Sequence, residues 1–331
     1  MGRELLFLID GFGFDTLDTY ADAMPTMSRM FNHGVIQTSF PSTTATSLAT
    51  LTTGQLPSAH GMLGYTVQVP RSGGRLLNAL KWDERVDPEN WQPVETLFQR
   101  AAAAGINVSH VAAKRYENSG FTRAVFRGAN YKGANVVTDL ISETKAALQA
   151  TPSFVYLYVN DLDTAGHSDG VGSDKWLAAL TMIDQMVSQL MKEVPKGTRM
   201  WVTSDHGMVN STQQLILGQD NDLLKNVTLI GGEPRARHIY IKAGAEAETV
   251  AQWQEFFKDR ARILSKQAVI ESGLFGSNVS EDSVERMGDL IAIAQKDLIL
   301  IDPTRVREES SMVGHHGGTT DIEVLIPLLL A

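Results

Sequence analysis

The sequence of 331 residues predicts an α/β fold, in which helices flank a mostly parallel sheet and a smaller α+β subdomain is inserted. Three observations support this prediction. Short, continuously apolar runs recur along the chain, as is typical of strands buried on both faces. Helical patterns separate these runs, and alternating strands and helices favour parallel pairing. The segment 211–305 has a different pattern, with short strands close together, which indicates an insertion.

The predicted strands of the main sheet are short apolar runs that end at polar or glycine residues. They cover residues 5–9, 35–39, 154–159 and 200–203, and the chain ends in another apolar run at 323–330. Helices are predicted at 94–104, 136–150 and 173–194, because each is followed by Gly105, Pro152 or Pro195 as a stop signal. In the last helix, apolar residues recur at steps of three and four, and Ser173 stands at the N-cap position.

The inserted segment contains predicted strands at 238–242, 290–294 and 298–301, and the last two are expected to form a hairpin through 295–297. A helix is predicted near 246–264. The expected division is therefore a main α/β domain of residues 1–210 plus 306–331, and an inserted cap-like subdomain of residues 211–305.

Composition excludes several classes of function. The chain has no cysteine, so disulfides, a cysteine nucleophile and thiolate metal sites are excluded. It has 38 acidic and 29 basic side chains, a net charge of −9, which argues against a nucleic-acid polymer or an anionic membrane as partner. The negative net charge does not exclude small phosphorylated ligands. No apolar run has the length of a membrane span, so we expect a cytoplasmic protein, although Met1-Gly2 could follow a removed leader.

Carboxylates follow three of the predicted strands: Asp10, Asp161 or Asp163, and Asp205. Ligands of open α/β sheets bind at this edge of the sheet. Because three converging carboxylates repel one another and lose hydration, the arrangement favours a metal site.

Histidines accompany these carboxylates. His167 lies four residues after Asp163, His206 follows Asp205 directly, and a pair, His315-His316, lies in the glycine-rich segment near the end of the chain. Without cysteine, any metal must be held by oxygen and nitrogen.

A hydroxyl-rich segment follows the predicted strand 35–39 and opens a helix. Its first hydroxyls belong to Ser42, Thr43 and Thr44. The free N–H groups and the dipole at a helix N-terminus favour an anion, so one of these hydroxyls is expected at a phosphate site, whereas another is expected to cap the helix.

Taken together, the motifs of this chain resemble those of the alkaline phosphatase superfamily, in its branch of type I phosphodiesterases and nucleotide pyrophosphatases. They occur in the family's order from residue 10 to residue 317. The motifs are Asp10, Phe40-Pro41-Ser42-x-Thr44 with Thr53-Gly54, Pro57-x-x-His60-Gly61, Asp163-x-x-x-His167, Thr203-Ser204-Asp205-His206-Gly207-Met208 and His316-Gly317.

The resemblance implies an alkaline-phosphatase-like fold with two zinc ions, for which manganese is an alternative. It implies one ion held by Asp10, Asp205 and His206, and a second held by Asp163, His167 and His316. His316 is preferred to His315, because the family's last ligand directly precedes glycine.

The resemblance also implies that Thr44 is a nucleophile that forms a phospho-threonine intermediate. The family usually has an asparagine five residues after the histidine of the His-Gly motif, and here that position is Tyr65. The phenol of Tyr65, the amide of Asn78 or the backbone N–H of Thr44 could bind the phosphoryl oxygen instead.

Arg235 and Arg237 could bind a second phosphate, although structural pairing is favoured. The expected substrate is a small phosphorylated molecule, such as a nucleotide, with a phosphodiester or pyrophosphate bond. A phosphomonoesterase or phosphonate hydrolase is the alternative enzyme, and a phosphate-ligand binding protein is the non-enzymatic one. The sequence does not define the oligomeric state.

Overall fold

A seven-stranded sheet lies at the centre of the computed structural model, which describes residues 2–331. The strand order is β2-β17-β8-β1-β7-β5-β6. Five adjacent strands, β8, β1, β7, β5 and β6, are parallel, and β17 is antiparallel to both of its neighbours. The strands are β1 (Arg3–Ile9), β2 (Phe31–Gln37), β5 (Asn107–Ala113), β6 (Asn130–Ala134), β7 (Ser153–Val159), β8 (Thr198–Thr203) and β17 (Leu325–Leu330). The predicted fold class is confirmed.

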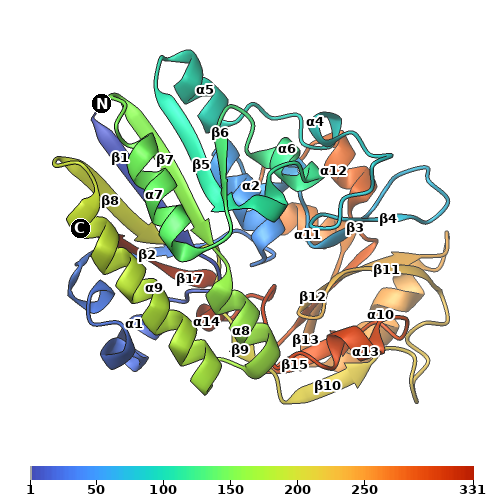
Figure 1. Ribbon diagram of the computed structural model, residues 1–331. Helices are drawn as coiled ribbons and strands as arrows, with labels where there is room; N and C mark the ends of the chain where they lie inside the picture. The colour runs from blue at the N-terminus through green and yellow to red at the C-terminus, as the bar shows by residue number, and fades with distance from the viewer. Residues whose placement is uncertain (1) are drawn as a thin grey trace.

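Helices cover both faces of this sheet (Figure 1). The helices α7 (Val137–Ala147), α8 (Asp161–Asp169) and α9 (Asp174–Glu193) lie on one face, and α2 (Thr44–Thr53), α5 (Leu97–Ala103) and α6 (Gly120–Val125) lie on the other. Leu5, Phe7 and Ile9 of β1 pack with α9, whereas Leu8 packs with α2 and α5. Both faces of β1 are therefore buried, which explains its continuously apolar sequence.

Short elements connect the larger ones. They are α1 (Thr16–Thr19), η1 (Ala21–Ala23), η2 (Met27–Arg29), α3 (Pro57–His60), β3 (Thr66–Gln68), β4 (Leu76–Asn78), α4 (Pro88–Trp91), η3 (Lys114–Tyr116), β9 (Val209–Asn210), α13 (Val306–Glu309), β16 (Gly314–His315) and α14 (Asp321–Val324).

A second, antiparallel sheet is built from the segment predicted as an insertion. Its order is β11-β12-β14-β13, with β11 (Val227–Glu233), β12 (Ala236–Ile241), β13 (Ala261–Ser265) and β14 (Leu290–Ala294). Trp253 and Phe257 of α10 (Glu246–Phe257) are fully buried against it. The helices α11 (Lys266–Ser272) and α12 (Glu281–Arg286) complete this part. The hydroxyl of Thr66 in β3 donates to Gly232 O over 2.8 Å, so this sheet also contacts the first half of the chain.

Two predicted features of this segment are wrong. The expected hairpin of 290–294 and 298–301 does not form, because β12 and β13 already occupy both edges of β14. Instead β15 (Leu298–Ile301) pairs in parallel with β10 (Gln213–Ile216). The expected helix 246–264 ends at Phe257, where Lys258 has a φ of 51°, and the chain continues as β13. Ala261 and Ile263 alternate there with an exposed Arg262, which is the pattern of a strand.

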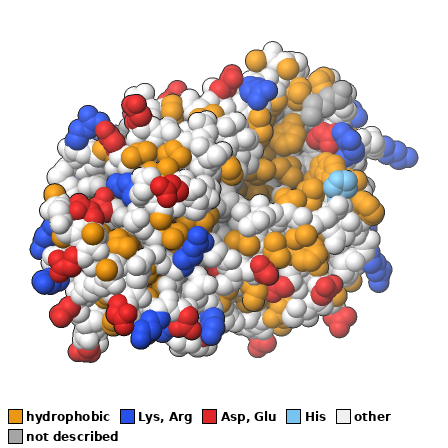
Figure 2. Space-filling model, turned by 180° about the vertical axis from the view of Figure 1, so that it is seen from behind, with side chains coloured by type: hydrophobic (Ala, Val, Ile, Leu, Met, Phe, Trp, Pro, Cys, Tyr) orange, Lys and Arg blue, Asp and Glu red, His pale blue; other side chains and the backbone are white. Residues whose placement is uncertain are grey.

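One edge of the main sheet keeps apolar side chains in contact with solvent. In β2, Phe31 is 64% exposed, and Val35 and Ile36 are also exposed. The surface seen from behind has hydrophobic side chains gathered in a hollow (Figure 2).

Within residues 2–331, no helix is both long and apolar enough to cross a membrane.

Candidate functional site

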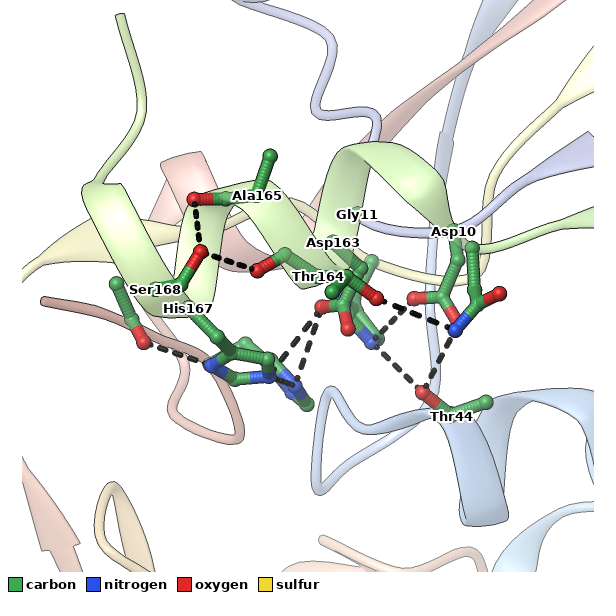
Figure 3. A network of polar contacts seen from close by, with 12 residues as sticks. Asp10, Gly11, Thr44, Asp163, Thr164, Ala165, His167 and Ser168 are labelled. Carbon is green, nitrogen blue, oxygen red and sulfur yellow. Dashed lines mark hydrogen bonds and ion pairs between the residues drawn. The ribbon is translucent and has the colours of Figure 1, made fainter. Parts of the chain in front are cut away.

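The predicted site residues meet at the carboxyl ends of three central strands. Asp10 directly follows β1, Asp205 and His206 follow β8, and Asp163 lies in the first turn of α8, just after β7. Figure 3 shows Asp10, Asp163 and Thr44 pointing toward one another from β1, α8 and α2. Parallel strands end at the same edge of a sheet, so residues more than 150 positions apart in the sequence become neighbours.

These side chains form two clusters. Asp10, Asp205 and His206 make the first, and Asp163, His167 and His316 make the second; within each, the potential ligand atoms lie within 4.8 Å of one another. Of the two aspartates that the sequence left open after the second strand, Asp163 is the one in a cluster, and Asp161 is exposed.

The separations between these atoms suit a metal ion. His206 Nε2 lies 3.4 Å from Asp10 Oδ1 and 3.5 Å from Asp205 Oδ2. His167 Nε2 lies 3.4 Å from Asp163 Oδ1, and His316 Nε2 lies 3.7 Å from the same oxygen. Ligand atoms of a tetrahedral site with bonds of ~2.0–2.1 Å are about 3.3 Å apart, so both clusters fit a cation of this kind.

Backbone carbonyls fix the tautomers of all three histidines. The Nδ1 atoms of His167, His206 and His316 lie 2.8, 3.0 and 2.9 Å from the oxygens of Gly314, Gly207 and Ser42. A carbonyl only accepts, so each Nδ1 carries the proton and each Nε2 presents its lone pair to a cluster. This arrangement is typical of histidines that bind metals.

The carboxylates lack protein partners on the sides that face the clusters. Within residues 2–331, no group makes a hydrogen bond with Asp10 Oδ1, Asp163 Oδ1 or Asp205 Oδ2, although all three atoms are buried. Burial raises the pKa of Asp10 well above its usual range, and the charges of Asp205 and Asp163 raise it further. Burial, with nearby His206 and His167, lowers the pKa of His316 well below its ordinary value. Three orphaned carboxylate oxygens beside imidazole nitrogens form a donor set that suits divalent cations.

Thr44 lies beside the first cluster as the first residue of α2. Its hydroxyl oxygen is 3.2 Å from His206 Nε2 and 3.4 Å from Asp10 Oδ2. The N-cap residue is Thr43, whose side chain makes no capping hydrogen bond. The first-turn N–H groups and the dipole of α2 are therefore directed at the same place as the Thr44 hydroxyl.

Ser42 orders the late segment that carries His316. It is fully buried, its hydroxyl donates to Gly318 O over 2.9 Å, and its oxygen accepts from Gly317 N–H over 3.1 Å. Gly317 has a φ of +117°, and a Cβ there would lie 2.6 Å from Glu233 Cγ. Glycine is therefore required directly after His316, both for its backbone conformation and for the close approach of β11.

Arg235 and Arg237, for which the sequence favoured structural pairing over a second phosphate, are committed to buried ion pairs. Arg235 donates to both carboxylate oxygens of Glu323 over 3.0 and 2.7 Å, and Arg237 pairs with Glu309. Both guanidinium groups are almost fully buried. This corrects the substrate-binding role, since neither group can reach a substrate without leaving its carboxylate.

Asn78 is not among the residues that line the hollows beside Thr44. Its Oδ1 accepts from the N–H groups of Leu80 and Lys81, so the side chain stabilises a turn after β4. Tyr65, in contrast, lines a hollow next to Thr44 and His316.

Two hollows flank Thr44 and Asp163. The first, of about 120 Å³, has several aromatic side chains in its wall, including Tyr116, Phe121 and Tyr158, and is called the aromatic hollow. The second, of about 420 Å³, has more charged side chains and is lined by Tyr65, Arg305 and Glu233, among others.

Sequence reasoning missed several residues of these hollows, among them Tyr158, Glu233 and Arg305. The hydroxyl of Tyr158 donates to Asp10 Oδ2, and the only available signal was the place of this tyrosine one residue before the end of a strand. Glu233 and Arg305 come from segments whose pairing the sequence did not reveal. Burial raises the pKa of Glu233 to about 8, and Tyr65 N–H donates to its carboxylate over 2.9 Å.

Comparisons with known proteins identify the family of this chain. The family model "Type I phosphodiesterase / nucleotide pyrophosphatase" matches residues 5–319. The fold and the motifs at the ends of its strands define a member of this class. The chain belongs to the type I phosphodiesterase/nucleotide pyrophosphatase family.

Similar curated proteins are distant and much longer. Ectonucleotide pyrophosphatase/phosphodiesterase family member 1 of Homo sapiens is 27% identical over 250 residues, which cover 70% of this chain and 26% of that protein. Venom phosphodiesterase of Macrovipera lebetinus is 24% identical over 229 residues, 62% of this chain and 25% of that protein. The chain thus spans about a quarter of the length of these relatives.

Solved structures share the fold over nearly the whole chain. Murine ectonucleotide pyrophosphatase/phosphodiesterase 5 has a TM-score of 0.78 at 18% identity, covering 98% of this chain and 87% of that one. An inactive form of the murine protein in complex with AMP has the same TM-score at 17% identity, covering 99% and 87% of the two chains.

Proposed function

We propose that this chain hydrolyses phosphodiester or nucleotide pyrophosphate bonds through a covalent phospho-threonine intermediate on Thr44. The observation that carries the proposal is the position of the Thr44 hydroxyl, at a helix N-terminus and within 3.4 Å of the cluster residues Asp10 and His206. A hydroxyl placed against a metal-type donor set and an anion-binding helix end is suited to attack on phosphorus.

Two divalent cations complete this proposal. Asp10, Asp205 and His206 would hold one, and Asp163, His167 and His316 would hold the other, as the free Nε2 and carboxylate atoms permit. We propose zinc, with manganese as the alternative, because oxygen and nitrogen ligands accept both. When bound, the cations supply positive charge that offsets the three carboxylates and lowers the pKa of the Thr44 hydroxyl.

The residues of the chain then carry out two displacements. Thr44 Oγ1 forms a bond to phosphorus as the bond from phosphorus to the leaving oxygen breaks, and the proton of the hydroxyl passes through solvent to the leaving group. The N-terminus of α2 stabilises the phosphoryl oxygens, and Tyr158 holds Asp10 in place by its hydrogen bond. Water next attacks the same phosphorus, which releases a phosphomonoester and returns a proton to Thr44 Oγ1.

The surroundings support a small diester or pyrophosphate substrate, such as a nucleotide. A diester carries two substituents on its phosphorus, and two hollows that are both lined by Thr44 are available to them. The aromatic hollow can receive an aromatic group. The AMP bound to the murine structural neighbour supports a nucleotide as the ligand.

The test is hydrolysis of bis-p-nitrophenyl phosphate by the metal-loaded protein and its variants. Thr44→Ala is expected to lower turnover by roughly 1,000-fold or more, the scale seen when a nucleophile is removed, and Thr44→Ser is expected to keep part of it. Thr52→Ala, at the other end of α2, is the matched control. Near wild-type turnover by Thr44→Ala with both metals bound would overturn the mechanism.

The same assay separates the alternatives. A strong preference for p-nitrophenyl phosphate would favour a monoesterase on the same clusters. A protein that binds phosphate ligands but turns over neither ester, with metal added, would favour a binding protein.

A further inference from the structure

Of the two hollows beside Thr44, only the second is lined by a lysine or an arginine of the described residues. Among the lysines and arginines in residues 2–331, Arg305 alone lines either hollow. It shares the hollow with Thr44, His316 and Tyr65. The first hollow, which Thr44 also lines, has no lysine or arginine among its described lining residues, so the two hollows offer a substrate different chemistry.

The chain holds Arg305 in a defined position. It follows β15 through a turn in which Asp302 Oδ1 accepts from the N–H and the hydroxyl of Thr304, each over 2.8 Å. The backbone N–H of Arg305 donates to Asp302 O over 2.9 Å. The side chain is only 24% exposed, and its guanidinium carbon lies 5.7 Å from the centre of the Tyr65 ring. An aromatic face beside a guanidinium orients it without using its N–H donors.

Arg305 keeps N–H donors beyond those that its carboxylate neighbours take up. Its Nη2 and Nε lie 3.0 and 3.3 Å from the two oxygens of the half-exposed Glu308 carboxylate. Its Nη1 lies 3.6 Å from Glu309 Oε1, an ion-pair separation that is beyond hydrogen-bond length. Glu309 is already paired with Arg237. A guanidinium has five N–H donors in a planar fork, so those on Nη1 are available to an anion in the hollow.

We propose that Arg305 binds the second phosphate of a pyrophosphate substrate, so that this chain prefers a phosphorus joined to another phosphate over one joined to an uncharged group. The inference rests on the proposed hydrolase function. Thr44 Oγ1 forms the new bond to the attacked phosphorus. The bond to the bridging oxygen breaks, the electron pair leaves with that oxygen, and Arg305 binds the released phosphate, on which negative charge develops while the bond breaks. The proton from Thr44 passes through solvent to this phosphate.

The experiment compares two substrates of the metal-loaded protein. ADP-ribose carries a second phosphate, and thymidine 5′-(p-nitrophenyl phosphate) does not. Arg305→Ala is expected to lower kcat/KM for ADP-ribose by roughly 10- to 100-fold, the scale of the loss of a charge-assisted hydrogen bond. The same variant is expected to change kcat/KM for the nitrophenyl ester by less than about threefold. Arg305→Lys is expected to recover part of the ADP-ribose activity.

Arg307→Ala is the matched control, because Arg307 lies in α13, the short helix whose N-cap residue is Arg305, but is exposed and outside the second hollow. It is expected to behave as wild type on both substrates. Equal losses on both substrates, or no loss with Arg305→Ala, would overturn the role of Arg305 while the hydrolase function stands. A wild-type protein that cleaves neither substrate would overturn the proposed function, and the inference with it.

Discussion

Histidines of this chain differ in role according to the partner of each ring nitrogen. His167, His206 and His316 use one nitrogen on a backbone carbonyl and leave the other facing carboxylates. His238 uses both: its Nε2–H donates to Leu63 O over 3.0 Å, and its Nδ1 accepts from Gly288 N–H over 3.1 Å. A histidine with both nitrogens satisfied by backbone is structural, and it must stay neutral to accept the second bond.

His238 should therefore make stability depend on pH. Burial lowers its pKa from 6.5 to about 4, so the unfolded chain binds the extra proton first as the pH falls. The contribution of neutral His238 to the free energy of unfolding is fully present above pH 6.5 and is lost as the pH falls toward 4. From the difference between the two pKa values, the free energy of unfolding is expected to fall by about 3 kcal/mol over this range. Urea unfolding of the chelator-treated protein from pH 7 to pH 4 measures it.

His238→Gln is the variant to compare. It is expected to be less stable than wild type at pH 7, but to lose less stability between pH 7 and pH 4, because the group that takes up the proton is absent. Parallel losses in the two proteins would show that His238 does not contribute to the pH dependence.

The sequence could predict site residues where a local pattern revealed them. Asp10, Asp163 and Asp205 each follow a continuously apolar strand, and the structure brings them together at one sheet edge. Their roles as metal ligands stay predictions. Arg305 and Tyr158 could not be predicted, because their place in the site depends on how distant segments pack and not on neighbouring residues.

At the scale of elements, one ion pair joins the second sheet to the end of the chain. Arg235 lies in the turn between β11 and β12, and Glu323 lies in α14; both side chains are 0% exposed. Arg235 also donates to Leu298 O of β15 over 2.6 Å, and Glu323 accepts from Gly318 N–H over 2.8 Å. The pair therefore connects three elements and the segment after His316.

Arg235→Ala is expected to lower the free energy of unfolding by about 3–5 kcal/mol, because it leaves Glu323 buried without its partner. The KM of the folded enzyme should change little, since Arg235 does not reach either hollow. Urea unfolding and steady-state kinetics measure the two quantities. Arg262→Ala, at an exposed position of β13, is the control and should stay within about 0.5 kcal/mol of wild type. Unchanged stability with a raised KM would instead support a substrate contact for Arg235.

Prediction of elements succeeded where burial alone determines the pattern. The strands β1, β7 and β8 are central, and their apolar runs were recognised within a few residues of their bounds. The strands β5 and β6 were not predicted. β5 is buried, but Ser109 and His110 interrupt its apolar run, and β6 reads Asn-Tyr-Lys-Gly-Ala and is an edge strand with several exposed side chains. The hairpin of β14 and β15 was wrong, because the partner of a strand is chosen by tertiary packing. The division of the chain at residues 211 and 305 stays a prediction.

At the scale of the whole molecule, the site is a junction of segments from most of the chain. The two clusters draw on residues from 10 to 316, and the rings of His206 and His316 stack with centres 3.7 Å apart. Without cations, the junction places three carboxylates against one another, with burial and mutual repulsion raising the pKa of Asp10 and Asp205. Bound metal should therefore stabilise the whole fold, because it binds the assembled clusters and not the unfolded chain.

Removal of metal by a chelator is expected to lower the thermal midpoint. Two sites, each at about 100 times its dissociation constant, add about 5 kcal/mol, which corresponds to a shift on the order of 10 °C for a chain of this size. His167→Ala removes a ligand from the second cluster and should reduce the shift to about half, while exposed His33→Ala should keep all of it. Scanning calorimetry with metal analysis of the same samples measures this. An unchanged midpoint after verified metal loss would mean that the clusters are not coupled to folding, and a full shift in His167→Ala would mean that the second cluster contributes nothing to it.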